Sequence, residues 1–89
     1  MDRTDKYSIT FARSARKEIE TLDTPILLRV FKRIEALVGN PRPEGCRKIQ
    51  SEQTLWRIRV GDYRVIYAID DALHIVDIVT VRHRSEAYR

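Results

Sequence analysis

The stretch LWRIRVGDYRVIYAI (residues 55–69) decides the fold of this chain. On each side of Gly61-Asp62, large apolar residues recur at every second position, which is the period of a β-strand. A two-residue Gly-Asp linker between such runs is typical of a tight hairpin turn. The sequence therefore predicts two antiparallel strands, at residues 55–60 and 63–69.

Further strands are expected on both sides of this hairpin. Residues 73–82, LHIVDIVTVR, are rich in β-branched side chains and follow a second turn. Residues 7–11, YSITF, predict a first strand, and residues 46–50 are a candidate for another short one. The preceding loop, NPRPEG at residues 40–45, contains two prolines and a glycine, which exclude helix and strand there.

Helical periodicity follows the first strand. Apolar residues recur at helical spacing over residues 12–22, with Thr10 as the expected cap. A second apolar stripe begins after Thr24, the expected N-cap, and Pro25, which suits the first helical position. Gly39 ends this stripe. Because few residues separate the two helices, they are expected to form an antiparallel hairpin.

The order of elements is strand, helix, helix and then three to four strands. This order predicts an α+β fold, a mostly antiparallel sheet with the helical hairpin on one of its faces. A chain of 89 residues can bury one modest core, so we expect a single domain over residues 1–89. The other face of the sheet is then left without a helix.

Composition excludes several classes of protein. Apolar residues (43%) and charged residues (34%) are balanced as in a folded domain rather than a disordered tail. No apolar run approaches the roughly 20 residues of a membrane-spanning helix, and the charged start is unlike a signal peptide. We therefore expect a cytoplasmic protein with no membrane partner. Cys46 is the only cysteine and there are two histidines, so no disulfide, metal site or cofactor is expected.

Arginine dominates the basic residues. The net charge is +4, and four lysines among 17 basic residues leave 13 arginines. The guanidinium group offers a planar fork of donors that fits phosphate, which lysine lacks. A basic, arginine-rich domain favours nucleic acid or an acidic partner. The positions of the arginines on the strands decide between such a site and an ordinary basic surface.

Strand parity assigns three arginines to one face of the sheet. In residues 55–60 the apolar set is even-numbered and is expected to face the helices, so Arg57 and Arg59 take the uncovered face. In residues 63–69 the apolar set is odd-numbered, which leaves Arg64 on the same uncovered face.

Acidic residues are scarce near these arginines. Asp62 and Glu52 are the only ones expected nearby, whereas Arg47 and Lys48 add two more cations. We therefore expect a phosphate-binding face, with Arg47 and Lys48 contacting RNA. In the alternative, each arginine lies over the sheet and pairs with a carboxylate. An exposed Arg64 also implies that its removal leaves no core cavity and changes stability by roughly 0.5 kcal/mol or less.

Two segments carry a resemblance to a known family. WRIRVGDYRVIY (residues 56–67) and VRHRSEAY (residues 81–88), with the opening YSITF and the Asn-Pro loop, resemble the RelE/ParE superfamily of bacterial toxins from toxin–antitoxin pairs. The resemblance covers nearly the whole chain and implies a compact ribonuclease fold. For the RelE branch it implies an enzyme that cuts mRNA in the ribosomal A site, using the ribose 2′-hydroxyl as nucleophile and no metal.

The resemblance also implies a set of catalytic residues. Five positions match the basic and aromatic set of the family: Arg57, Arg59, Arg64, Arg82 and Tyr88. The best-known RelE pattern has lysines at the first two of these positions. Because arginine effectively never loses its proton, Arg57 and Arg59 can stabilise charge but are poor general bases.

Proton transfer is therefore expected from another side chain. Tyr88 is one candidate, either as a base whose pKa the arginines lower or as a platform that stacks on a nucleobase. His83 is the other, since its unperturbed pKa of about 6.5 suits proton transfer near neutral pH. The alternative for His83 is a surface histidine between two arginines. Arg84 adjoins it and is expected to contact RNA.

Three functions stay open from the sequence. The first is a ribosome-dependent mRNA endonuclease that inhibits translation, with the ribosome and mRNA as partners. The second is a ParE-type toxin that inhibits DNA gyrase and cuts nothing, and the third is an RNA-binding domain without turnover. For either toxin, the resemblance implies a cognate antitoxin. Its acidic or amphipathic segment is expected to cover the arginine-bearing face or the neighbouring edge of the sheet.

Overall fold

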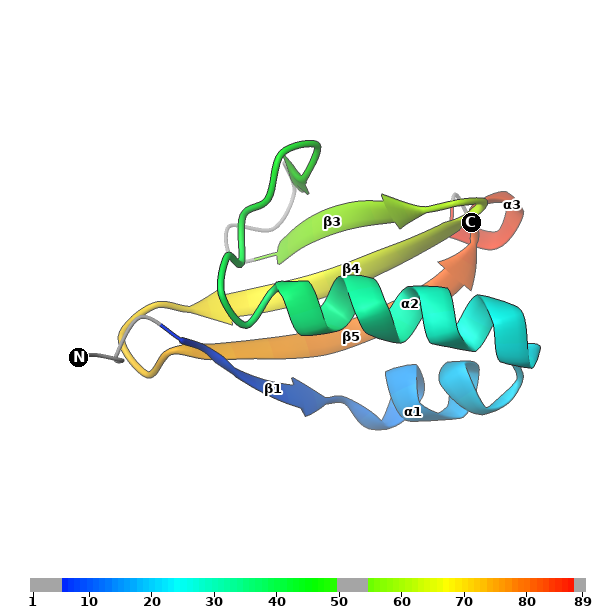
Figure 1. The fold of residues 1–89 in the computed structure, drawn as a ribbon, viewed down its shortest axis with the longest axis horizontal. Helices are drawn as coiled ribbons and strands as arrows, with labels where there is room; N and C mark the ends of the chain where they lie inside the picture. The colour runs from blue at the N-terminus through cyan, green and yellow to red at the C-terminus, as the bar shows by residue number, and fades with distance from the viewer. Residues whose placement is uncertain (1–5, 50–54, 88–89) are drawn as a thin grey trace.

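In the part of the chain described here, a five-stranded sheet is covered on one face by two helices (Figure 1). The computed structural model describes residues 6–49 and 55–87. The strand order across the sheet is β1-β5-β4-β3-β2. The elements are β1 (Ser8–Phe11), α1 (Arg13–Glu20), α2 (Thr24–Ala36), β2 (Arg47–Lys48), β3 (Leu55–Val60), β4 (Tyr63–Asp70), β5 (Ile75–His83) and α3 (Arg84–Ala87).

The hairpin of β3 and β4 forms where the sequence predicts it. Val60 pairs with Tyr63 across the turn, and Gly61 has a φ of 60°. A two-residue turn of this kind needs a left-handed residue at its first position, which glycine adopts without strain. The turn fixes the register of the strands and therefore which side chains face each other across them.

The edge of β5 is closed partly by a strand and partly by a helix. β1 pairs in parallel with β5 as far as Ile78, whereas the other strand pairs are antiparallel. Further along, the Ser14 hydroxyl of α1 donates to the Val79 carbonyl, and the Val81 amide donates to the Glu18 carboxylate, both at 2.8 Å. An open strand edge is a template for unwanted pairing, so these two side chains of α1 protect it.

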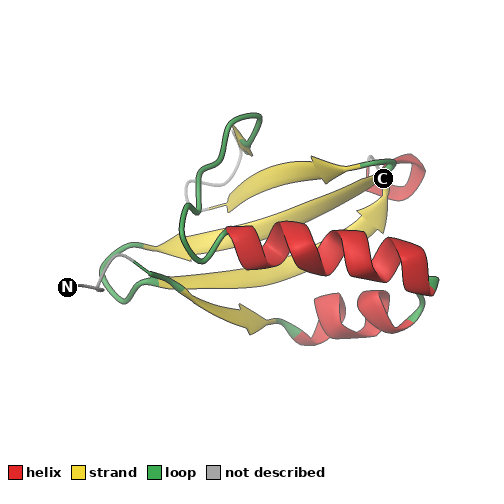
Figure 2. Cartoon of the chain, viewed as in Figure 1, coloured by secondary structure: helices red, strands yellow, loops and turns green. Residues whose placement is uncertain are grey.

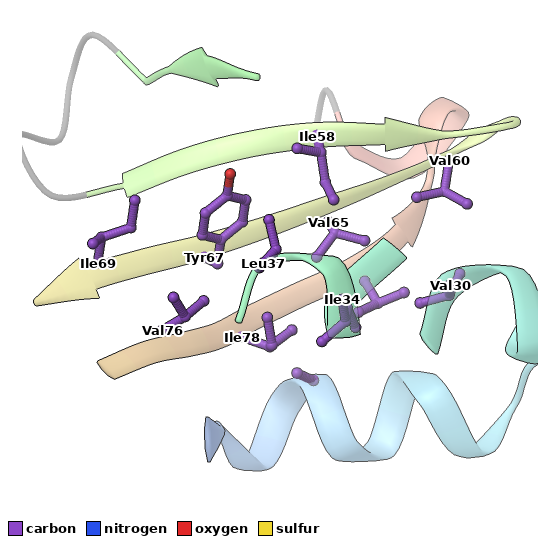
Figure 3. Packing of buried hydrophobic residues seen from close by; sticks show 12 residues of the cluster. Val30, Ile34, Leu37, Ile58, Val60, Val65, Tyr67, Ile69, Val76 and Ile78 are labelled. Atoms are coloured by element: carbon purple, nitrogen blue, oxygen red, sulfur yellow. The ribbon is translucent and has the colours of Figure 1, made fainter. Parts of the chain in front are cut away.

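The core lies between the helices and the sheet (Figure 3). Val30 and Ile34 of α2, with Leu37 just beyond the helix, pack against buried apolar residues of β3, β4 and β5. Tyr67 is fully buried at the centre, and its hydroxyl donates to the Pro41 carbonyl at 2.8 Å. Burial raises the pKa of Tyr67 well above its ordinary value of 10.0. A neutral Tyr67 thus ties the loop after α2 to the sheet.

Both longer helices lie on the same side of the sheet, and they run antiparallel to each other (Figure 2). α3 is a single turn of four residues that contacts the ends of β4 and β5. The face of the sheet opposite α1 and α2 is therefore the open face in the described part of the chain.

The predicted α+β fold with its helical hairpin is confirmed, whereas the predicted helix caps are wrong. α1 begins at Arg13, and Thr10, the expected cap, donates to the Asp77 carboxylate at 2.6 Å instead. Thr24 is the first residue of α2 rather than its N-cap. The sequence pattern did not indicate α3. None of the described helices is long and apolar enough to cross a membrane.

Candidate nucleic-acid interface

Three arginines form a row across β3, β4 and β5. Arg59 lies opposite Arg64, and Arg64 lies opposite Arg82, in the register of the antiparallel pairs. Residues directly opposite each other project on the same side, with Cβ atoms roughly 5 Å apart. Their chain neighbours Ile58 and Val65 are buried in the core, so the three arginines lie on the open face. We call Arg59, Arg64 and Arg82 the arginine row.

A β-bulge brings Arg82 into this row. Ile66 pairs with Thr80 and Tyr67 pairs with Ile78, so Val79 has no partner on β4. One extra residue shifts the alternation of side chains by one position beyond it. The core residues of β5 are even-numbered before the bulge and odd-numbered after it, and Arg82 consequently projects on the open face.

Next to the row, arginines line a surface hollow of about 270 Å³. The lining residues, which we call the arginine hollow, are Gly45, Arg47, Arg57 and Arg59. Arg47 lies directly opposite Arg57 between β2 and β3. Within the described residues, none of these three arginine side chains has a hydrogen bond or an ion pair. Like charges this close repel each other unless an anion lies between them, so the hollow suits a phosphate group.

Lys48 does not contribute to the arginine hollow. It lies opposite Trp56, and its ammonium group is 5.9 Å from the centroid of the Trp56 ring. Trp56 packs against the core, and successive residues of a strand face opposite sides of the sheet. Arg47 is therefore at the candidate interface and Lys48 is not.

A charged cluster fixes the loop that leads into the arginine hollow. Arg42 donates to the two oxygens of Asp71 at 3.2 and 2.8 Å, and the Tyr7 hydroxyl donates to Asp71 at 2.6 Å. The hydrogen bonds from Arg42, and then from Tyr7, lower the pKa of Asp71 to about 2. The Arg42 guanidinium also lies 5.0 Å from the centroid of the Trp56 ring. The sequence pattern gave no signal for this cluster, because it joins distant parts of the chain.

Glu18 is an acidic partner of the arginine row. Its carboxylate forms an ion pair with Nε of Arg82 and also accepts a hydrogen bond from the Val81 amide. The acids expected near Arg57, Arg59 and Arg64 were Asp62 and Glu52, and Glu18 adds a carboxylate that compensates Arg82. Glu18 precedes Arg82 by 64 residues, so local sequence gives no indication of the pair. Glu52 lies outside the described residues.

Arg64 is on the predicted face but is only 6% exposed. A charged side chain enclosed to this extent needs partners for most of its donors within the protein, and Arg64 does interact with other residues. Replacing it by alanine removes a buried aliphatic stem as well as those contacts. The expectation of a negligible change in stability, which assumed an exposed side chain, is therefore wrong.

His83 lies on the helix face of β5, away from the arginine row. It is paired with Tyr63, and the two rings meet edge to face with their centroids 5.3 Å apart. The Ser85 amide donates to Nδ1 of His83 at 3.2 Å. Since Arg82 and His83 are successive residues of one strand, the alternation of side chains separates them onto opposite faces.

Two of the predicted site residues, Arg84 and Tyr88, follow β5 in the sequence. Arg84 begins α3, where its side chain is exposed and its amide donates to the Asp62 carbonyl at 2.7 Å. Tyr88 lies outside the described residues. Among the residues that are described, no three His, Cys, Asp or Glu side chains are grouped so as to hold a metal ion.

Comparison with known proteins identifies the family. A family model described as "ParE toxin of type II toxin-antitoxin system, parDE" matches residues 9–88. The chain belongs to the RelE/ParE superfamily of toxins. Toxin RelE of Mycobacterium tuberculosis is 32% identical to this toxin over 84 residues, which cover 93% of this chain and 87% of the relative. Toxin RelG of the same organism is 32% identical over 87 residues, with coverage of 93% and 97%.

Solved structures share the fold of this toxin. A chain in the RelBE2 toxin–antitoxin complex from Mycobacterium tuberculosis is 30% identical, with a TM-score of 0.78 over 89% of this toxin and 99% of that chain. A chain in the archaeal RelE–RelB complex from Pyrococcus horikoshii is 23% identical, with a TM-score of 0.80 over 91% and 98%. At this lower identity the likeness concerns the fold alone.

Proposed function

We propose that this toxin is a metal-independent endoribonuclease that cuts mRNA on the ribosome and so inhibits translation. The observation that carries the proposal is the arginine hollow next to the arginine row, an array of cations on an open sheet face. The relatives named RelE and RelG, each at 32% identity, support the same branch of the superfamily. In the proposed reaction the ribose 2′-oxygen attacks the adjacent phosphate and the 5′-oxygen leaves.

In this proposal the arginines stabilise negative charge. Arg64 and Arg82 contact the pentacovalent phosphorane, whose charge exceeds that of the substrate phosphate. The arginine hollow holds a neighbouring phosphate of the RNA by two-pronged hydrogen bonds. Glu18 engages Arg82 through Nε, which sets the plane of the guanidinium group. Exposed Arg84 adds a further contact to the RNA backbone.

Proton transfer needs a group other than arginine. We assign it to Tyr88, which matches the tyrosine of the family pattern and follows the strand that carries Arg82. His83 is the second candidate. Its ring lies against Tyr63 on the other face of the sheet, so a direct role would require the RNA to reach around the end of β5.

The alternative function is that of a ParE-type toxin, which inhibits DNA gyrase without cutting RNA. The match to the ParE family model favours it. The basic set on the open face favours the ribonuclease, because inhibition of gyrase by binding requires no array of cations aimed at a scissile phosphate.

We also propose a cognate antitoxin as partner. The two structurally similar chains described above come from complexes of a toxin with its antitoxin. An acidic or amphipathic segment that folds over the arginine row and the arginine hollow would neutralise their charge and block RNA. Co-purification of the toxin with the product of an adjacent gene tests this, and recovery from its host only as a free monomer would contradict it.

In vitro translation with the purified toxin, followed by mapping of mRNA 5′ ends, tests the ribonuclease proposal. Cuts within translated codons are expected, and naked RNA should stay intact because the ribosome must orient the substrate. Intact mRNA together with gyrase-linked DNA breaks would instead support the ParE alternative.

A further inference from the structure

A second pocket lies on the helix side of the sheet, at the tip of the β3–β4 hairpin. Its volume is about 320 Å³, and it is lined by Ile26, Arg29, Val60, Asp62, Tyr63 and His83. We call these residues the tip pocket. Three elements contribute to it: α2, the hairpin and the end of β5. In the reaction proposed above, His83 is the second candidate for proton transfer, and no other residue of this pocket has a role.

The Arg29 guanidinium lies close to the hairpin turn. A Cβ atom added to Gly61 would lie 3.0 Å from Nη2 of Arg29, so the absence of a side chain at Gly61 lets the guanidinium approach the turn. Among the described residues, none accepts a hydrogen bond from this guanidinium or forms an ion pair with it. Its donors are therefore available to a ligand in the tip pocket.

His83 adds a ring nitrogen and an aromatic surface. The Ser85 amide donates to Nδ1 at 3.2 Å and the Ser85 hydroxyl lies 2.9 Å from the same nitrogen, so Nε2 is the ring nitrogen that can meet a ligand. The edge-to-face contact with Tyr63 sets the two rings nearly perpendicular, with an interplanar angle of 85°. The pocket thus combines aromatic and apolar walls with the donors of Arg29 and a ring nitrogen of His83.

Asp62 decides which ligand class fits. A phosphate group would meet the repulsion of this carboxylate, which opposes the attraction of Arg29. A flat, uncharged group that has both donors and acceptors on its edge can use both residues. Guanine has this pattern: N1–H and the 2-amino group donate to a carboxylate, while O6 and N7 accept from a guanidinium. Adenine, cytosine and uracil do not have two neighbouring donors for the carboxylate together with two neighbouring acceptors for the guanidinium.

We propose that the tip pocket binds a guanine base of RNA, an inference that rests on the proposed RNA-cleaving function. Tyr63 precedes Arg64 and His83 follows Arg82, so the tip pocket and the arginine row occupy the two faces of the same end of the sheet. RNA that bends around this end places a phosphate at the row and a flanking base in the pocket. The base stacks on an aromatic wall, and Asp62 and Arg29 select guanine.

Binding of short 2′-O-methyl oligouridylates with one central guanosine, adenosine, cytidine or uridine tests this inference. The methyl group removes the nucleophile, so binding is measured by fluorescence anisotropy without cleavage. The guanosine oligonucleotide should bind about tenfold more tightly than the others. Asp62→Asn and Arg29→Gln should lose this preference and keep the affinity for oligouridylate. Glu35→Gln and Arg13→Gln, exposed substitutions elsewhere on the helices, are the matched controls and should keep the preference.

The inference is overturned if wild type shows no guanosine preference or no binding, or if both pocket variants keep the preference. Its failure is distinct from failure of the proposed function, which is read separately as cleavage of ribosome-bound mRNA by wild type. Guanosine preference that depends on Asp62 and Arg29 in a toxin that cuts no message would support the pocket and reject the nuclease. Cleavage of ribosome-bound mRNA by a toxin that has no guanosine preference would support the nuclease and reject the pocket.

Discussion

Glu18 in α1 binds Arg82 in β5 and accepts the amide of the preceding residue with its other carboxylate oxygen. One side chain therefore both protects the strand edge and orients an arginine of the proposed site. Glu18→Gln should keep the hydrogen bond to the backbone and lose the ion pair. We expect cleavage of ribosome-bound mRNA to fall several-fold while stability changes by about 1 kcal/mol or less. Single-turnover cleavage with parallel thermal melts measures both effects.

The control for this variant is Glu20→Gln, an exposed residue of the same helix. If Glu18→Gln cleaves at the wild-type rate, Glu18 protects the strand edge and has no part in positioning Arg82.

Arg64 should respond differently to two substitutions. Arg64→Ala is expected to reduce cleavage by about 10²–10³ through loss of a phosphorane contact. Because the side chain is 6% exposed, this variant should also lose roughly 1–3 kcal/mol of stability. Arg64→Lys keeps the buried stem and the charge but not the planar fork, so it should fold better than the alanine variant and still cleave poorly. Full activity of Arg64→Lys would reject two-pronged phosphate contact.

The arginine hollow should be stabilised by anions. Inorganic phosphate is expected to raise the Tm of wild type more than chloride at equal ionic strength, because it offsets repulsion among Arg47, Arg57 and Arg59. Arg57→Gln should lose most of this increase. Arg13→Gln, an exposed change on α1, should keep it, which separates binding in the hollow from a general salt effect. An equal response of the two variants would exclude a specific anion site.

Much of this interface follows from sequence because a strand alternates. The apolar even positions of residues 55–60 and the Gly-Asp turn suffice to put Arg57, Arg59 and Arg64 on one face, as observed. Short-range rules determine both features, since side-chain period and turn geometry depend on neighbouring residues alone.

Other parts of the interface depend on contacts that no local pattern encodes. The bulge at Val79 reverses the alternation within β5, so parity counted from the start of that strand would send Arg82 to the wrong face. The pairing of Glu18 with Arg82 and the enclosure of Arg64 arise from packing of distant segments. His83 directly follows Arg82 in the sequence, yet successive residues of a strand face opposite sides of the sheet.

Tyr88→Phe and His83→Gln should distinguish the candidates for proton transfer. If Tyr88 moves a proton, removal of its hydroxyl should abolish most cleavage; if it only stacks on a base, the phenylalanine ring should preserve activity. We expect a large loss for Tyr88→Phe and a small one for His83→Gln, whose ring faces Tyr63 on the other side of the sheet. The pH–rate profile provides a second readout. A pH dependence of cleavage that disappears in His83→Gln would reverse the assignment.

Stability at acid pH should depend on Asp71. Its folded-state pKa is about 2, below the ordinary 3.8, so the ionised form is favoured by folding. The stabilisation is complete above pH 3.8 and is lost as the pH falls toward 2. The Tm of wild type should therefore be higher than that of Asp71→Asn near neutral pH. The two Tm values should converge as the pH falls from 3.8 toward 2. Glu44→Gln, another exposed change, should leave the acid limb of the wild-type curve unaltered; a constant difference between wild type and Asp71→Asn at all pH values would contradict the assignment.

The parallel pairing of β1 with β5 has a consequence for the order of events during synthesis. Ser8 of β1 pairs with Ile75, the first residue of β5. The same strand, β5, also pairs with β4. Contacts between such distant residues form late, because closing the long intervening loop costs chain entropy before any contact rewards it. A nascent chain that lacks residues 75–83 has no Arg82 and no finished sheet. If the proposed function holds, a ribosome that makes this toxin does not meet the active nuclease until the last strand has been added.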